Sequence, residues 1–161
     1  MGSEVLWAEG ALTVRRFREG DLPELAALLA DPEVMRWLEP PFDRARAAEF
    51  LRVAGLSEPP LIYAAEEDGA FLGYVIFHRY GGEDAAELGW VLRRSAWGRG
   101  YAGRLTALLL SAAEGKWAET VIECAPEQRA SARVAEKLGF REEGMADGCR
   151  VFRRTVPRDG T

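Results

Sequence analysis

The chain has 161 residues, of which 48% are hydrophobic and 29% are charged, and this composition is typical of one globular domain rather than of a disordered, collagen-like or disulfide-stapled chain. Its formal net charge of −5 disfavours a nucleic-acid partner, because such proteins need a dominant basic surface. The longest apolar stretch, residues 105–113, is far shorter than the roughly 20 residues of a membrane span, and no secretory signal is recognisable, so we expect a soluble cytoplasmic protein without a membrane partner.

The elements of the first half are predicted from the spacing of apolar residues. They are, in chain order, a strand around Leu12, Val14 and Phe17, a helix that begins at the N-cap Asp21 and carries Pro23 and the apolar residues 25–29, a helix over residues 44–53, and a hairpin of residues 61–65 and 71–77 about the turn Asp68-Gly69. An aspartate before the first turn and a proline within it favour a helix start. β-Branched and aromatic residues favour the hairpin.

The second half alternates strands and helices in the same way. Its predicted elements are a strand over residues 87–92, a helix after Gly103 with Leu105, Leu108, Leu109 and Ala112 on one face, a strand over 120–124, a helix opened by Pro126 and closed by Gly139, and strands over 140–145 and 151–156. No repeat or linker interrupts this order. We therefore predict an α/β (α+β) fold in one domain, residues 1–161 with a core of about 11–156, whose single sheet is flanked by helices.

The segment Trp97-Gly-Arg-Gly-Tyr-Ala-Gly103 lies directly before a predicted helix. Glycines there allow a tight turn that exposes successive N–H groups at the helix N-terminus, which is an anion site suited to phosphate. Four arginines that surround the loop are candidates for pairing with phosphate oxygens, or else are solvated side chains around a turn: Arg93, Arg94, Arg99 and Arg104.

The spacing Gly98-x-Gly100-x-x-Gly103, with Glu123 twenty residues further on, also fits a dinucleotide-binding fingerprint. Against this alternative, residues 93–97 separate the strand from the first glycine, and the hairpins before it imply antiparallel pairing. Only 58 residues follow Gly103, too few for the remainder of such a domain with a substrate domain.

Three motifs resemble the GNAT superfamily of N-acetyltransferases. The segment Glu87-Leu-Gly-Trp-Val-Leu-Arg-Arg-Ser-Ala-Trp-Gly-Arg-Gly-Tyr-Ala-Gly103 resembles its acetyl-CoA-binding motif, and Ser131-Ala-Arg-Val-Ala-Glu-Lys-Leu-Gly-Phe140 resembles its later helix-and-strand signature. Asp31-Pro-Glu-Val-Met-Arg-Trp-Leu-Glu-Pro-Pro41 is similar to the RimJ/RimL-like branch, which acetylates N-terminal amines of ribosomal proteins. The resemblance covers about residues 11–156.

The resemblance implies a mixed, mostly antiparallel sheet whose central strands splay apart and leave a slot for the pantetheine arm of acetyl-CoA, the cosubstrate. It places the backbone of Val91, Leu92 and Arg93 against pantetheine. It places the pyrophosphate on Arg99, Gly100, Tyr101, Ala102 and Gly103, with Trp97 and Gly98 also among the cofactor-binding residues. A backbone N–H of Val91 or Leu92 would meet the developing oxyanion.

Some positions depart from the superfamily pattern. Trp97 stands at a position where the superfamily often has Gln or Arg. Tryptophan at this position is familiar in the RimJ/RimL-like branch. Gln128 replaces an asparagine that would contact the cofactor, and offers a similar amide on a longer stem. Ala135 replaces a tyrosine that often donates a proton, which leaves Ser131, Tyr101 or water to assist the leaving thiolate.

Transfer of an acyl group to an amine needs a neutral nitrogen, so a base must take the proton of an α-amino group that titrates near 8. Glu87 begins the strand beside the cofactor and is the candidate base. His78, the lone histidine, is an alternative suited to neutral pH, and Glu83 and Asp84 are weaker alternatives in a loop. For each of these residues, a structural or solvated role remains open.

The acceptor groove is expected between the segment with Trp37, Leu38, Pro40 and Phe42 and the late hairpin, residues 144–150. Trp37 and Phe42 are expected to serve as core anchors, and Trp90 to pack under the sheet. Cys124 and Cys149 lack disulfide-framework or metal-ligand spacing, so we expect reduced thiols and no metal.

We predict an acetyl-CoA-dependent N-acetyltransferase that acts on a primary amine, either a small molecule or a protein N-terminus. A non-catalytic acyl-CoA-binding module is the alternative from another class. Association of two copies through a sheet edge is left open.

Overall fold

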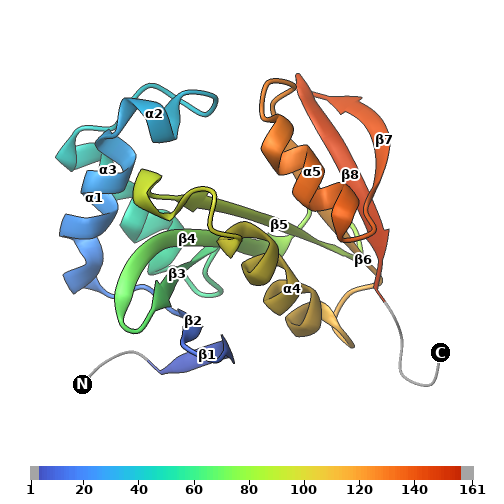
Figure 1. Cartoon of the computed structure of the whole chain (residues 1–161). Coiled ribbons are helices and arrows are strands. Elements are labelled where there is room, and N and C mark those ends of the chain that lie inside the picture. Colours follow the sequence, from blue (N-terminus) through green and yellow to red (C-terminus); the bar gives the residue numbers. More distant parts are fainter. Residues whose placement is uncertain (1–3, 157–161) are drawn as a thin grey trace.

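The centre of the structure, a computed structural model that describes residues 4–156, is one sheet of eight strands in the spatial order β1-β2-β3-β4-β5-β6-β8-β7 (Figure 1). The strands are β1 (Val5–Glu9), β2 (Leu12–Arg15), β3 (Ile62–Glu67), β4 (Ala70–Arg79), β5 (Ala85–Leu92), β6 (Glu119–Cys124), β7 (Arg141–Ala146) and β8 (Cys149–Thr155). In the described part of the chain all neighbouring pairs are antiparallel except β5 with β6. This confirms the mixed, mostly antiparallel sheet and excludes the parallel sheet of a dinucleotide fold.

Helices cover both faces of this sheet. They are α1 (Leu22–Ala30), α2 (Pro32–Met35), α3 (Arg44–Phe50), α4 (Tyr101–Ala113) and α5 (Arg129–Lys137), with short turns of 3₁₀ helix at Glu19–Asp21 and Arg94–Ala96 and of π helix at Leu51–Gly55. In Figure 1, α1, α2 and α3 group together away from α4 and α5. Every helix in residues 4–156 is too short or too polar to cross a bilayer.

Side-chain alternation along β5 divides the core in two. Leu88 and Leu92 point into a cluster with α4 and α5 that contains Leu105 and Phe152, whereas Val91 points into a cluster with α1 and α3 on the other face. Successive strand residues face opposite sides of a sheet, so β5 contributes to both clusters. Any ligand that binds along β5 is therefore held by a strand fixed from both faces.

The two central strands splay apart. β5 and β6 pair only from Ala85 with Glu119 to Glu87 with Val121, although β5 continues to Leu92 and β6 to Cys124. On its other side β5 stays paired with β4 along its whole length. One edge of β5 beyond Glu87 is consequently left without a partner strand, as the family resemblance implies.

Several details differ from the sequence predictions. α4 begins at Tyr101, so that Gly103 lies within it and not before it, and Phe17 lies outside β2. Strand β1 was not predicted, nor was α2, a single turn that begins at Pro32. The carboxylate of Asp21 precedes α1 but does not cap it, because it accepts two hydrogen bonds from the buried Arg15 at 2.8 and 2.9 Å. Pro126 lies before α5, which begins at Arg129.

Candidate active site

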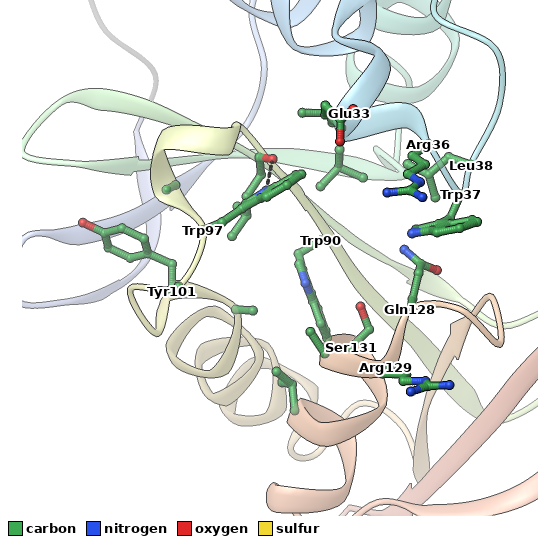
Figure 2. Close-up of a pocket in the computed structure, with 18 of the residues that line it drawn as sticks. Glu33, Arg36, Trp37, Leu38, Trp90, Trp97, Tyr101, Gln128, Arg129 and Ser131 are labelled. Carbon is green, nitrogen blue, oxygen red and sulfur yellow. Dashed lines mark hydrogen bonds between the residues drawn. The ribbon is translucent and has the colours of Figure 1, made fainter.

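A cavity of about 560 Å³ lies along the free edge of β5 (Figure 2). Three groups of residues line it: the end of β5 with the glycine loop, the start of α5, and the segment of α2 with the turn after it. The lining residues used below are Glu33, Arg36, Trp37, Leu38, Trp90, Val91, Leu92, Trp97, Gly98, Gly100, Tyr101, Ala102, Gly103, Glu127, Gln128, Arg129 and Ser131. The cavity thus gathers most of the predicted cofactor-binding residues.

The glycine loop presents free backbone donors at one end of this cavity. Gly98 and Gly100 have positive φ values of 71° and 81°, a region in which side chains other than glycine are strained. Within the described residues, none of the N–H groups from Gly98 to Gly103 makes a hydrogen bond of good geometry. The first N–H group of this segment that makes one is that of Arg104, which donates to the Gly100 carbonyl at 3.2 Å. Six unpaired donors at the start of the 13-residue helix α4 form an anion site.

Two of the four arginines near the loop are engaged elsewhere. Arg94 pairs with Asp31 at 2.7 Å, and Arg104 pairs with Glu9 at 2.9 Å. Arg93 and Arg99 have no carboxylate partner among residues 4–156, although neither lines the cavity. The two side chains that remain to meet a phosphate are therefore Arg93 and Arg99, and both are exposed.

The register of β5 decides which of its backbone groups face the cavity. The N–H of Tyr80 donates to the Ala85 carbonyl and that of Arg93 to the Leu72 carbonyl, both at 2.8 Å, so the odd-numbered positions of β5 bond to β4. The even-numbered positions Trp90 and Leu92 face the gap instead. The N–H groups of Val91 and Arg93, both expected to contact pantetheine, therefore point towards β4, and those of Trp90 and Leu92 are the ones at the free edge.

Trp97 is fixed by a hydrogen bond rather than by burial. Its indole N–H donates to the Leu92 carbonyl at 2.8 Å, the dashed line of Figure 2, while the side chain is 48% exposed. The bond ties the start of the glycine loop to the end of β5. It also occupies the carbonyl of Leu92, so that the N–H of this residue is the group left for a ligand.

The start of α5 supplies the opposite wall. The amide oxygen of Gln128 accepts a hydrogen bond from the N–H of Ala125 at 2.8 Å, so the orientation of the amide leaves its NH₂ group as a donor. Ser131 lines the same cavity, and Ala135 is fully buried in the core. The hydroxyl of Tyr101 donates to Glu67 at 2.9 Å and points away from Ser131 in Figure 2, so Ser131 is the hydroxyl that faces the cavity.

Glu87 lies at the last residue of β5 that pairs with β6, opposite His78 on β4. The Nε2 atom of His78 is 3.7 Å from a carboxylate oxygen of Glu87, and about a quarter of each side chain is exposed. Burial raises the pKa of Glu87, the charge of His78 lowers it, and the charge of Glu123 raises it, with a net rise. Glu87 does not line the cavity, and its side chain leaves the face of β5 opposite to that of Trp90.

A second polar group lies on the same face as Glu87. The hydroxyl of Tyr80 donates to Glu123, which raises the pKa of Tyr80. Burial, together with the charges of Glu123, Asp147 and Glu87, raises the pKa of the Cys149 thiol. Burial likewise raises the pKa of Cys124, and both cysteines are free thiols.

The acceptor wall was only partly predicted. Trp37 and Leu38 line the cavity with 42% and 44% of their surfaces exposed, whereas Phe42 is buried in the core. The prediction of a core anchor is thus right for Phe42 and wrong for Trp37. No residue of 144–150 lines the cavity, and the loop acids Glu83 and Asp84 are exposed away from it.

Trp90, Glu33 and Arg36 were missed as cavity residues. Trp90 was expected to pack under the sheet, and its side chain does pack against the core cluster with Leu88. Its backbone position at the free edge follows from the pairing of β5 with β4, which the sequence alone does not give. Nothing in the sequence places Glu33 and Arg36, because α2 brings them to the cavity from far along the chain. Among residues 4–156, no group of three or more His, Cys, Asp and Glu side chains could hold a metal ion.

Comparisons with known proteins agree with this geometry. An N-acetyltransferase of Bacillus subtilis strain 168, YnaD, which is itself uncharacterized, is 27% identical over 151 residues, or 91% of this chain and 85% of YnaD. The fold is that of RimL, the ribosomal L7/L12 α-N-protein acetyltransferase, in complex with coenzyme A (TM-score 0.82, 21% identity, 97% and 100% of the two chains). It is also that of spermidine N-acetyltransferase from Vibrio cholerae in complex with CoA and spermine (TM-score 0.77, 18% identity, 91% and 96%).

The family model described as the acetyltransferase (GNAT) domain matches residues 11–141, most of the chain. The match spans β2 to the start of β7 and contains the splayed strands, the glycine loop and the start of α5. The chain is therefore an N-acetyltransferase that belongs to the GNAT family.

Proposed function

We propose that this enzyme transfers an acetyl group from acetyl-CoA to a primary amine, and that the donor binds in the cavity along β5. The observation that carries the proposal is the row of unpaired N–H groups from Gly98 to Gly103 beside the free edge of β5. A diphosphate would accept hydrogen bonds from this row. Pantetheine is an amide chain, so its groups would pair with the backbone of Trp90 and Leu92 as a neighbouring strand does.

The donor, when bound, supplies an activated acyl group as a thioester. The acceptor nitrogen forms the new C–N bond as the C–S bond breaks. Glu87, which does not line the cavity, takes the proton of the amine through a water. Its half-buried position, which raises the pKa, makes its carboxylate a stronger base. A backbone N–H at the free edge of β5 would stabilise the developing oxyanion, and Ser131 would donate a hydrogen bond to the departing sulfur.

Membership of the RimJ/RimL-like branch and action on a protein N-terminus belong to this proposal. The likeness to RimL supports the fold of that branch. Trp97 also supports it, because members of the branch commonly have tryptophan at this position. The free thiols Cys124 and Cys149 suit a reducing compartment, so we propose a cytoplasmic enzyme. The proposal does not depend on whether the enzyme is a monomer or a homodimer.

Replacement of Gly100 by valine tests the diphosphate seat. A β-branched residue is strained at φ 81°, and nothing lies within 4 Å of an added Cβ, so the loop rather than the packing is disturbed. We expect coenzyme A at 100 times its Kd to stabilise the native chain by about 2.7 kcal/mol, visible as a higher Tm, and NAD to leave the Tm unchanged. In Gly100→Val the shift by coenzyme A should be lost.

Gly115→Val is the matched control. Gly115 follows the far end of α4 with φ 78° and equally open surroundings, so it carries the same backbone strain without touching the cavity. It should lower the Tm of the free chain and keep the full shift by coenzyme A. Retained binding in Gly100→Val, or no binding by the unmodified chain, would contradict the proposal.

A further inference from the structure

Two large apolar side chains are exposed at the end of the cavity. Trp37 and Leu38 follow the single turn of α2 and are 42% and 44% exposed, although an indole and an isobutyl group gain free energy from burial. The neighbouring Phe42 is buried in the core. Trp37 and Leu38 both line the cavity, so their exposed surfaces face a space that a ligand can fill.

This end of the cavity is the one expected to receive the acceptor. In Figure 2, Trp37 and Gln128 lie on the side away from Tyr101, where the glycine loop enters α4. If the diphosphate lies on the glycine loop, as the proposed function requires, the acyl end of the donor points away from that loop. The acceptor amine must then meet the acyl group beside Trp37 and Leu38.

The charges that line the cavity do not select a polycation. Two carboxylates, Glu33 and Glu127, are balanced by two guanidinium groups, Arg36 and Arg129. The guanidinium carbon of Arg36 lies 4.6 Å from the centre of the Trp37 ring, so a positive charge already covers the indole. A second ammonium group on the acceptor would be repelled at this place, while an apolar group would be favoured.

We propose that Trp37 and Leu38 form a specificity wall, and that the acceptor is a primary amine with an apolar, preferably aromatic, group within a few bonds of the nitrogen. A small arylalkylamine and a peptide whose first side chain is apolar share this chemistry. The inference rests on the proposed function and deepens it by naming the class of acceptor.

A panel of amines tests the class and its source. We expect kcat/KM for 2-phenylethylamine or for a phenylalanyl tripeptide to exceed that for spermidine and for a seryl tripeptide by about tenfold or more, the discrimination that an apolar pocket commonly provides. Whichever of the two aromatic substrates has the higher kcat/KM shows whether the natural acceptor is a small molecule or a peptide. Equal or better turnover of spermidine or of the seryl peptide would overturn the class and leave the acetyltransferase function standing.

Substitutions locate the wall. Leu38→Ala and Trp37→Ala should each raise KM for the aromatic amine by about tenfold with little change in kcat, and Trp37→Phe should recover most of the loss. Leu56→Ala is the matched control, because Leu56 is 39% exposed and lies outside the cavity. The Tm shift by coenzyme A should persist in all four variants.

Three results would contradict the proposals, and they distinguish a failure of the specificity wall from a failure of the proposed function. KM values in Leu38→Ala and Trp37→Ala that equal those of Leu56→Ala would overturn the wall, as would intact coenzyme A binding without turnover of any aromatic amine. Absence of both coenzyme A binding and turnover with every amine would overturn the proposed function itself.

Discussion

At the scale of single residues, the candidate base is set by its neighbours. Glu87 is half-buried, faces His78 and shares its side of the sheet with Glu123. Burial and the negative charge of Glu123 favour the protonated carboxyl, and the charge of His78 opposes them. The carboxylate form, which the proposed role as a base requires, is therefore lost at a higher pH than for an exposed glutamate.

This arrangement predicts an acid limb in the pH profile. We expect kcat/KM to fall as the pH drops through the raised pKa of Glu87, at a pH above the value near 4.3 of an ordinary glutamate. Glu87→Gln should lower kcat/KM by about 100-fold or more and remove this limb. In His78→Ala the limb should move to higher pH, because a protonated imidazole no longer favours the carboxylate.

Glu83→Gln provides the comparison for this experiment, since Glu83 lies in the loop before β5 and bonds to Arg153. Its profile should match that of the unmodified enzyme. An unchanged rate and acid limb in Glu87→Gln would place the base elsewhere. Steady-state rates from pH 5 to 9 at saturating acetyl-CoA provide the measurement.

The location of some site residues could be predicted from the sequence, and that of others could not. Gly98 and Gly100 were assigned correctly to a turn before a helix, because only local backbone geometry is involved. Gly103 was assigned wrongly, since α4 begins two residues earlier at Tyr101. Trp37 was assigned wrongly to the core, because its exposure depends on where α2 and its following turn lie against the cavity. Asp21 has the right position for a helix cap, but a distant guanidinium competes for its carboxylate.

At the scale of elements, a buried ion pair joins β2 to the start of α1. Arg15 and Asp21 are 4% and 7% exposed and form two hydrogen bonds, and Arg15 also bonds to Glu66 on β3 at 3.0 Å. Burial acts to raise the pKa of Asp21, but the bonds from Arg15 and from the N–H of Arg18 outweigh it, and the pKa is lowered. The ionised form is thus favoured in the native state.

Removal of this charge is expected to destabilise the fold. Asp21→Asn should lower the free energy of unfolding at pH 7 by about 3 kcal/mol, because it leaves a buried guanidinium short of its partner. The stabilisation is fully present above the unfolded-state pKa near 3.9 and is lost as the pH falls towards the lower pKa of the native state. Urea unfolding at pH 7 and at pH 3 measures both effects.

Asp31→Asn is the matched substitution at the start of α2. Asp31 also pairs with an arginine, Arg94, but that side chain is 59% exposed, so the loss should stay below about 1 kcal/mol. Equal losses in the two variants would show that the burial of Arg15 is not decisive.

The short elements were the hardest to predict. β1 consists of five residues, most of them exposed, and its pairing with β2 is what makes it a strand. α2 has four residues, fewer than the periodicity of a helix can reveal. The longer α4 and β5 were recognised because their apolar residues repeat at a clear spacing. Register, which places the backbone groups of Trp90 and not those of Val91 at the free edge of β5, follows only from the assembled sheet.

At the scale of the whole molecule, the sheet is weakest where the cavity lies. Three residue pairs join β5 to β6, and β6, α5, β7 and β8 pack together beyond this junction. The cavity is lined from both sides of it, by Trp90 and Leu92 on β5 and by Gln128 and Ser131 at α5. A ligand in the cavity would therefore replace part of the missing strand pairing.

This division predicts where a ligand slows hydrogen exchange. On addition of coenzyme A, amides of residues 88–92 and 129–134 should exchange more slowly, since local opening of the splayed region becomes less favourable. Amides of the β1–β2 hairpin, at the distant edge of the sheet, should be unaffected. Exchange followed by mass spectrometry separates these segments, and protection limited to residues 98–104 would show that the two sides are not bridged.

The two cysteines offer a practical benefit for such work. Because burial raises the pKa of both Cys124 and Cys149, a smaller share of each is thiolate, and both should react with maleimide more slowly than an exposed cysteine. A single cysteine introduced at an exposed position, for example at Ala45, would then carry a spectroscopic probe selectively, without prior removal of either native sulfhydryl.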